Sequence, residues 1–207
     1  LWNRRYDPGG VAADATLKHV LRERGLRAES FDGHLLHEPS RLSTGSGSFY
    51  KVFTPFWNAL ATSPEPRDPI DAPNRLNGFS GKVASESLDD LFPLPTSPDW
   101  ADGLRESWTP GEDGAQARLE EFLSEGLEDY AAGRDFPGSP STSRLSPHLA
   151  HGEVTPYQIF AALRDRGKEA GRADIAKFRK EIGWREFCYY LLFHNPQLHK
   201  KNFQPGF

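Results

Sequence analysis

The fold class of this chain is decided by residues 173–194, which read ADIAKFRKEIGWREFCYYLLFH. Apolar side chains recur along this segment every three or four positions, which is the spacing of one face of an α-helix. The residue before a proline disfavours helical backbone, so we expect the helix to end ahead of Pro196. The apolar positions are Ile175, Phe178, Ile182, Phe187, Tyr190 and Leu191.

Two further amphipathic helices precede this segment, so the chain is predicted to be mainly helical from residue 115 onward. Residues 116–133 place their apolar side chains on one helical face. Thr155 and Pro156 predict the start of another helix, with the threonine as N-cap and the proline at the first helical position. The apolar positions are Leu119, Phe122, Leu123, Leu127 and Tyr130 in the first helix, and Ile159, Phe160 and Leu163 in the second.

The first part of the chain has a different pattern. Residues 11–25 predict a helix, residues 26–31 resemble a short strand, and residues 1–3 resemble the end of another strand. Together they predict the end of an α/β layer.

A connection is predicted between these two parts. Residues 53–57, which read FTPFW, predict a helix start with Thr54 as the cap and Pro55 at the first helical position. Residues 62–114 are rich in Pro, Ser, Gly and Asp, which is typical of a linker. Linkers of this length tend to separate domains or to wrap a surface.

Composition narrows the class of protein. Hydrophobic residues make up 37% of the chain and charged residues 26%, as in a packed protein, and no apolar run is long enough to span a membrane. The single cysteine, Cys188, cannot form an internal disulfide, which favours a reducing cytoplasm. Histidines, cysteines and carboxylates do not occur in the spacing of a metal site, so no metal is expected.

The net charge of −4 hides an uneven distribution. Residues 164–207 contain ten Lys or Arg and five Asp or Glu. Such a basic segment is a candidate surface for a polyanion. On charge alone, a solvated helix face rich in lysine is the commoner explanation.

Residues 142–147, which read TSRLSP, bring hydroxyl groups and backbone amides to a predicted helix start. Unpaired N–H groups and the helix dipole favour an anion at such a position, and a dinucleotide pyrophosphate would suit it. The alternative is an ordinary N-cap with spare hydroxyls, which local chemistry alone favours.

Residues 181–187, which read EIGWREF, are the second candidate site. Glu181 and Arg185 are four positions apart and are predicted to pair, and Glu181 and Trp184 are predicted to share one helical face. A Trp beside an Arg can stack on a base and hold a phosphate. The alternative is a core Trp with a surface ion pair, which these residues alone favour.

The chain resembles the DNA photolyase/cryptochrome family in six blocks that follow the family's order and spacing. TSRLSPHL and GWREF are the most specific matches, and the resemblance is closest to photolyases that repair cyclobutane pyrimidine dimers. The blocks are WNRRYDP (2–8), GHLLHEP (33–39), TGSGSFYKVFTPFW (44–57), DYAAGRDFP (129–137), TSRLSPHLAHGEVTP (142–156) and EIGWREF (181–187).

The resemblance implies an α/β N-terminal remnant followed by a mainly α-helical flavin-binding domain, incomplete at both ends. Residues 1–55 match the end of the α/β antenna-type domain, residues 56–114 the interdomain linker and residues 115–207 the first part of the helical FAD-binding domain. We therefore expect an internal piece of a longer parent protein that is inactive by itself. The parent is expected to be a cytoplasmic monomer that binds FAD, with or without a folate- or flavin-type antenna chromophore.

The resemblance also implies residue roles. Glu181 would hydrogen-bond a lesion base and stabilise its radical anion, Trp184 would pack against the flipped-out dimer, and Arg185 would hold a backbone phosphate. The implied cofactor-binding residues are Tyr130, Thr142, Ser143, Arg144, Leu145 and Ser146. The implied DNA-binding residues are Arg134, Glu181, Trp184 and Arg185, with Glu181 and Trp184 as the catalytic pair.

The activity that the resemblance implies is a light-driven lyase reaction on ultraviolet-damaged DNA. Reduced FAD donates an electron to the dimer, which splits and returns it, so the flavin carries the difficult step. Two alternatives stay open. One is a cryptochrome-type blue-light photoreceptor, and the other is a truncated, non-catalytic remnant that acts at most as a binding module.

Overall fold

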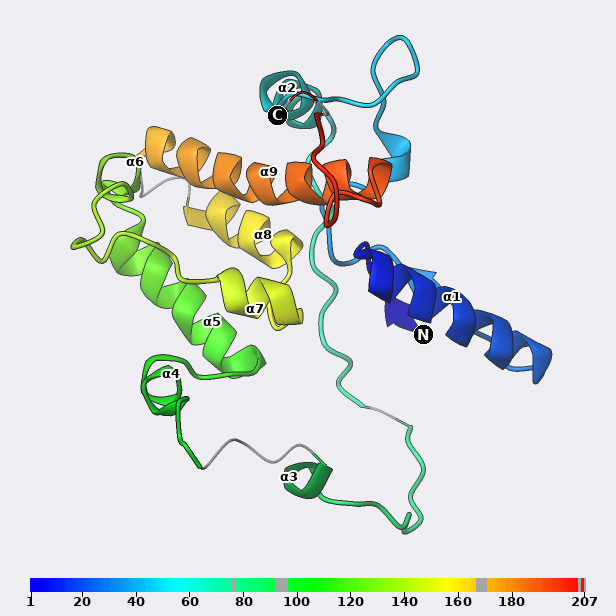
Figure 1. Ribbon diagram of the computed structural model, residues 1–207. Helices are drawn as coiled ribbons and strands as arrows, with labels where there is room; N and C mark the ends of the chain where they lie inside the picture. The colour runs from blue at the N-terminus through cyan, green and yellow to red at the C-terminus, as the bar shows by residue number, and fades with distance from the viewer. Residues whose placement is uncertain (76, 92–96, 167–170, 205, 207) are drawn as a thin grey trace.

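The structure, a computed structural model, describes residues 1–75, 77–91, 97–166, 171–204 and 206. Figure 1 shows several helices gathered beneath α9, with α1 to one side and a long connection that passes through α3 and α4. The elements are β1 (Trp2–Asn3), α1 (Pro8–Glu23), β2 (Ser30–Phe31), η1 (Pro39–Arg41), α2 (Phe53–Ala61), α3 (Leu88–Leu91), α4 (Asp102–Ser107), α5 (Glu112–Glu121), η2 (Phe122–Gly126), α6 (Tyr130–Gly133), α7 (Ser146–His151), α8 (Pro156–Arg166) and α9 (Arg172–His194).

The N-terminal part is a small α/β layer. β1 and β2 pair in parallel, and α1 supplies the crossover that parallel neighbours need. The side chain of Asp7 accepts a hydrogen bond from the backbone N–H of Gly10, which caps α1 and lets it begin at Pro8, ahead of the predicted start. The predicted α/β beginning of the chain is therefore confirmed, although the strand predicted over residues 26–31 is limited to Ser30 and Phe31.

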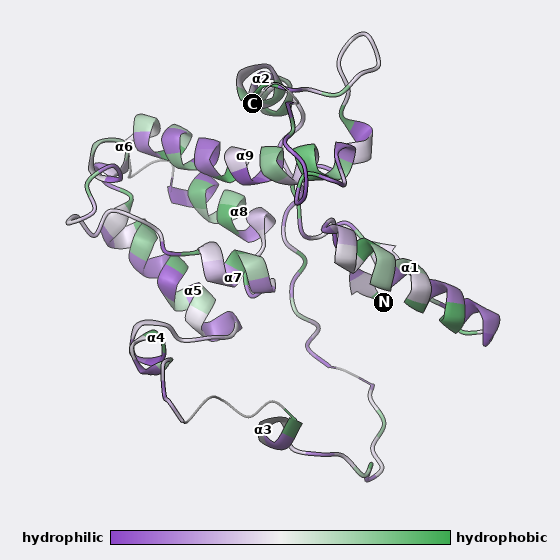
Figure 2. Cartoon of the chain, in the orientation of Figure 1, coloured by the Kyte–Doolittle hydropathy of each residue, from purple (hydrophilic) through white to green (hydrophobic). Residues whose placement is uncertain are grey.

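The helices that follow bury a continuous hydrophobic core. Figure 2 shows hydrophobic and hydrophilic residues interspersed along α5, α8 and α9, so that each helix offers apolar side chains to its neighbours. α8 begins at Pro156 after Thr155, and α9 ends at His194 ahead of Pro196, both as predicted. The buried core residues are Leu36, Ala115, Leu119, Phe122, Leu127, Tyr130, Leu145, Leu149, Val154, Tyr157, Ile159, Phe160, Leu163, Phe178 and Ile182.

The prediction of one continuous helix over residues 116–133 is wrong. α5 ends at Glu121 and is followed by η2, a π-helical turn that widens the helix. Asp129 then adopts left-handed backbone with φ of 59°, which α-helical backbone excludes. The predicted apolar positions are nevertheless buried, except that Leu123 is only partly so.

α2 packs on α9 through a second, largely aromatic cluster. α2 begins at Phe53 after Val52 and has no side-chain cap, so the prediction of Thr54 as cap and Pro55 as the first helical residue is wrong. Thr54 and Pro55 lie in the first turn instead, where a missing N–H costs no helical hydrogen bond. The buried members of the cluster are Phe53, Phe56, Leu60, Phe187 and Tyr190.

The connection between α2 and α5 is long and mostly exposed along its described residues. It contains the short helices α3 and α4, and the predicted linker over residues 62–114 overlaps the start of α5 at Glu112. The proposed division into domains after residues 55 and 114 stays a prediction.

Gly183 allows α2 to approach α9 closely. A Cβ atom at this position would collide with ring carbons of Trp57. We expect Gly183→Ala to lower the free energy of unfolding by about 1–3 kcal/mol, the usual cost of overpacking. Urea denaturation measures this change, with Gly103→Ala as the control because its Cβ would meet no atom within 4 Å. Equal stability of the two variants would contradict this packing.

Candidate functional site

A cavity of about 520 Å³ lies between α6, the segment from Thr142 to Ala150, and α9. We call it the α6–α9 cavity. It brings together all the residues implied for cofactor and DNA binding except Trp184, although they come from three separate stretches of the chain. Its lining residues are Tyr130, Arg134, Thr142, Ser143, Arg144, Leu145, Ser146, Leu149, Ala150, Phe178, Glu181, Ile182, Arg185 and Tyr189.

Glu181 and Arg134 join two walls of the cavity. Arg134 Nη1 lies 2.6 Å from Glu181 Oε1, and Lys177 Nζ lies 3.8 Å from the same oxygen. The predicted pairing of Glu181 with Arg185 is therefore wrong, because a longer-range partner occupies the carboxylate. Arg134 Nη1 also donates to the hydroxyl of Tyr130 at 3.3 Å. Burial raises the pKa of that phenol, so it stays protonated.

The Thr142–Ser146 wall presents hydroxyl groups that make few hydrogen bonds to the described part of the protein. α7 begins at Ser146 with Leu145 as N-cap and without a side-chain cap, so the alternative of an ordinary hydroxyl cap is wrong. Within the described residues, the hydroxyls of Thr142 and Ser146 have no hydrogen-bond partner, and Ser143 Oγ accepts weakly from the Leu145 N–H at 3.4 Å. Hydroxyls without partners can bind a polar ligand.

Arg144 is held beside this wall. It adopts left-handed backbone with φ of 53°. Its guanidinium lies 4.6 Å from the ring centroid of Trp108 and donates to the carbonyl oxygen of Ser107 at 3.2 Å. The connection that contains α4 thus touches the edge of the α6–α9 cavity.

Two neighbouring residues of α9 hold the GHLLHEP segment, residues 33–39. Glu186 Oε2 accepts hydrogen bonds from the backbone N–H groups of Leu36 at 2.8 Å and His37 at 3.3 Å. Arg185 Nη1 donates to the carbonyl oxygen of His34 at 2.9 Å. This segment and α9 are therefore fixed to each other.

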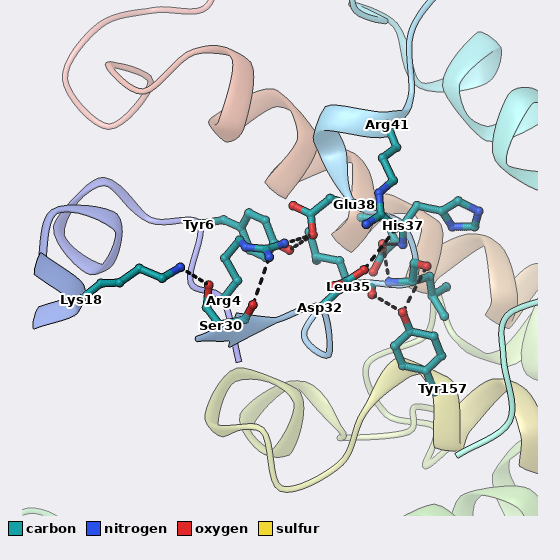
Figure 3. Close-up of polar contacts among 12 residues, drawn as sticks. Arg4, Tyr6, Lys18, Ser30, Asp32, Leu35, His37, Glu38, Arg41 and Tyr157 are labelled. Atoms are coloured by element: carbon teal, nitrogen blue, oxygen red, sulfur yellow. Dashed lines mark hydrogen bonds and ion pairs between the residues drawn. The ribbon is translucent and has the colours of Figure 1, made fainter. Parts of the chain in front are cut away.

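The same segment is fastened on its other sides. Figure 3 shows Tyr6 directed at Glu38 and Tyr157 of α8 directed at Leu35. The Tyr6 hydroxyl donates to Glu38 Oε2 at 3.0 Å, and the Tyr157 hydroxyl donates to the Leu35 carbonyl oxygen at 2.9 Å. The N-terminal layer, α8 and α9 thus meet at this segment.

Burial changes the acidity of two groups at this junction. Glu186 is 2% exposed, and its burial raises the pKa to about 8, an effect that Arg185 and the two backbone N–H groups oppose. Burial, together with the charge of Arg185, lowers the pKa of His34 to about 4. His34 is therefore neutral at pH 7, which leaves one ring nitrogen as an acceptor.

Trp184 lies outside the α6–α9 cavity. Its ring stacks on Phe53 with centroids 3.6 Å apart and an interplanar angle of 9°, and the residue is 43% exposed. Glu181 and Trp184 are three positions apart on α9, so their side chains lie about 60° apart around the helix, but Trp184 packs against Phe53 of α2 and not in the cavity. Its half-exposed ring remains open to a partner on that side.

Sequence reasoning missed Tyr189 and His34. Tyr189 lines the cavity four positions after Arg185, and its ring centroid lies 5.0 Å from that guanidinium. The helical repeat from Glu181 through Arg185 was a signal that could have found it. No local signal links His34 to Arg185, because they are 151 residues apart.

The described part of the chain offers neither a metal site nor a membrane span. It contains no group of three or more His, Cys, Asp or Glu side chains that could hold a metal ion. None of its helices is both long enough and apolar enough to cross a membrane.

The pKa of Glu186 predicts a pH dependence of stability. The folded state binds the proton of the Glu186 carboxyl more tightly than the unfolded state does. The contribution of Glu186 to the free energy of unfolding is therefore greatest below pH 4.5 and is lost as pH rises to about 8. Glu186→Gln removes the titration, so we expect the wild type to lose stability relative to this variant across that window.

Urea denaturation at a series of pH values measures the difference in free energy of unfolding. Glu128→Gln, at an exposed position, is the control and should give a difference that does not change with pH. A flat difference for Glu186→Gln as well would contradict the account of this buried carboxyl.

Comparison with known proteins identifies relatives along the whole chain. Residues 1–74 match the family model for DNA photolyase. The chain is 51% identical over 207 residues to deoxyribodipyrimidine photo-lyase of Agrobacterium fabrum, covering 100% of this chain and 43% of the relative. It is 34% identical to deoxyribodipyrimidine photo-lyase of a Synechococcus species, covering 95% and 42%, and 32% identical to cryptochrome-1 of Arabidopsis thaliana, covering 97% and 30%.

Solved structures agree with this relationship. A class III photolyase from Agrobacterium tumefaciens superposes with a TM-score of 0.92 at 52% identity, covering 97% of this chain and 42% of that one. A Synechocystis cryptochrome, at 20% identity and a TM-score of 0.69, shares the fold over 94% of this chain and 41% of its own. The chain thus spans about two fifths of the length of the photolyases that it matches.

Proposed function

We propose, from the premise that this chain belongs to the DNA photolyase/cryptochrome family, that it forms part of a flavoprotein that splits cyclobutane pyrimidine dimers in DNA with light. The observation that carries this proposal is the α6–α9 cavity, in which the Thr142–Ser146 wall meets Glu181 and Arg185 of α9. The 51% identity to a deoxyribodipyrimidine photo-lyase over the whole chain supports the lyase activity.

The cavity has the chemistry that the diphosphate of FAD requires. The hydroxyls of Thr142, Ser143 and Ser146 offer donors, and Arg144 adds a positive charge at the edge. Hydrogen bonds from charged donors to phosphate are stronger than those between neutral groups. Tyr130 and the buried Leu145 would complete this cofactor-binding set.

The α6 and α9 walls of the cavity together suit a polyanion with an extruded base. Arg134 and Arg185 would bind backbone phosphates, and Glu181 would accept a hydrogen bond from a lesion base. Trp184 would stack on the dimer from the neighbouring face, since aromatic stacking tolerates any base. Extrusion is required because chemistry on a base cannot occur inside the stacked duplex.

The bound flavin would supply the electron that splits the dimer, and the protein would supply binding, orientation and electrostatics. Arg134 holds the Glu181 carboxylate at 2.6 Å, which keeps that acceptor in a fixed position before the lesion enters. Such preorganised polar groups stabilise developing charge without reorganising during the reaction.

A second candidate function is that of a cryptochrome-type photoreceptor, favoured by the 32% identity to cryptochrome-1 over 97% of the chain. It needs the same flavin site but no repair. For either function we propose a cytoplasmic monomer, in which an antenna chromophore of the folate or flavin type can accompany FAD.

The test uses the product of the complete gene that contains this sequence. It is loaded with FAD, reduced, and mixed with an oligonucleotide that carries a cyclobutane dimer. We expect dimer loss under blue light and none in darkness. Trp184→Ala removes a stacking contact worth about 1–3 kcal/mol, so the Kd for damaged DNA should rise roughly tenfold.

Trp100→Ala is the matched control, because Trp100 is 70% exposed on the connection and far from the proposed lesion site in sequence. It should leave both repair and the Kd unchanged. Absence of light-dependent repair in a protein with bound and photoreduced flavin would reject the photolyase proposal in favour of the photoreceptor.

A further inference from the structure

The guanidinium of Arg185 lines the α6–α9 cavity, and two polar contacts join it to His34. Nη1 donates to the His34 carbonyl oxygen at 2.9 Å, and Nη2 lies 2.9 Å from His34 Nε2. Two bonds from a planar guanidinium to one residue fix its orientation as well as its position.

The His34 ring is itself immobilised by two aromatic neighbours. The Tyr189 ring meets it edge-on with centroids 4.9 Å apart, and the Tyr6 ring lies over it with centroids 6.3 Å apart and an interplanar angle of 28°. Tyr6 is anchored in turn by its hydrogen bond to Glu38. The acceptor nitrogen therefore has a defined place and does not follow movements of Arg185.

Glu186 cannot replace His34 as the partner of Arg185. Its Oε1 lies 3.4 Å from Arg185 Nη1, at the long end of the hydrogen-bond range. Its Oε2 is engaged by the backbone N–H groups of Leu36 and His37. The short contacts of Arg185 are thus both made to His34.

These bonds still leave Arg185 able to bind a ligand. A guanidinium has five N–H donors. Two are directed at His34 and one at Glu186, so two remain for a phosphate. An arginine whose orientation is set in advance loses less conformational entropy when it binds.

We propose that His34 is a positioning residue that aims the guanidinium of Arg185 into the α6–α9 cavity as a fixed phosphate-binding cation. This inference rests on the proposed function, in which Arg185 binds a DNA phosphate. His34 itself touches no ligand and acts only through Arg185.

The contact requires a neutral imidazole. A protonated His34 would donate from Nε2 and would place a second positive charge against Arg185. The groups that face His34 are Arg185 and Tyr189 from α9 and Tyr6 from the N-terminal layer, so among the described residues no carboxylate contacts the ring to favour its charged form. Burial lowers the pKa of His34, in agreement with this requirement.

The test compares His34→Phe, which keeps a ring and the backbone carbonyl but loses the side-chain acceptor, with His34→Gln, which keeps a side-chain acceptor. His37→Phe is the matched control in the same segment, because the described contacts include none between the His37 side chain and Arg185. Each variant of the complete gene product, with FAD bound, is titrated with a dimer-containing duplex over a series of salt concentrations. Arg185→Ala and the double variant with His34→Phe are measured beside them.

We expect Arg185→Ala and His34→Phe each to reduce the slope of log K against log salt by about 0.9, the value for one lost phosphate contact. The double variant should show no further loss, and His34→Gln and His37→Phe should keep the wild-type slope. A purely structural role would not change the salt slope in a folded, flavin-loaded protein.

The outcomes separate this inference from the proposed function. A slope reduced by Arg185→Ala but not by His34→Phe overturns the role of His34 and leaves the DNA contact of Arg185 standing. A slope unchanged by both variants overturns both assignments. If His34→Phe does not fold, His34→Asn replaces it, because the shorter amide does not reach Arg185 and the same slopes are expected.

Discussion

The rest of the structure depends on one buried carboxyl group. Glu186, in the interior of α9, accepts hydrogen bonds from the backbone N–H groups of Leu36 and His37, which lie about 150 residues earlier in the chain. A buried carboxyl without partners would be costly, and so would the buried amide of Leu36 without an acceptor. The Glu186 carboxyl and the backbone N–H groups of Leu36 and His37 therefore stabilise each other in the folded protein. Because Tyr6 and Tyr157 fasten the same segment, the N-terminal layer, α8 and α9 are held in one arrangement.

At this junction α9 presents side chains on three sides. Glu186 holds the GHLLHEP segment, Arg185 and Glu181 face the α6–α9 cavity, and Trp184 faces α2. A rotation or slip of α9 that improved one of these surfaces would disrupt the other two. The stack of Trp184 on Phe53 and the close approach of Trp57 to Gly183 fix the helix from the α2 side. We infer that the geometry of the proposed flavin and DNA sites is set by how α9 is held.

Local sequence patterns predicted the elements better than the contacts between them. The extent of α9, the start of α8 at Pro156 and the buried face of α8 follow from helical spacing and capping rules, which act over a few residues. The left-handed Asp129 that divides α5 from α6 left no such signal. The cavity residues came together in the prediction only through a family resemblance. Local patterns did not predict that Glu181 pairs with Arg134 or that Arg185 contacts His34. These partners are distant in sequence, and side-chain pairing across such distances depends on the whole fold.

Native-state hydrogen exchange at the amides of Leu36 and His37 tests the central claim most directly. Amides that open only when the whole molecule unfolds exchange with the free energy of global unfolding. The account predicts this slow exchange for both amides in the complete gene product, together with fast exchange at the exposed Gly45. Exchange of Leu36 and His37 as fast as at that glycine would contradict it, because α9 and the GHLLHEP segment would then not be fixed to each other.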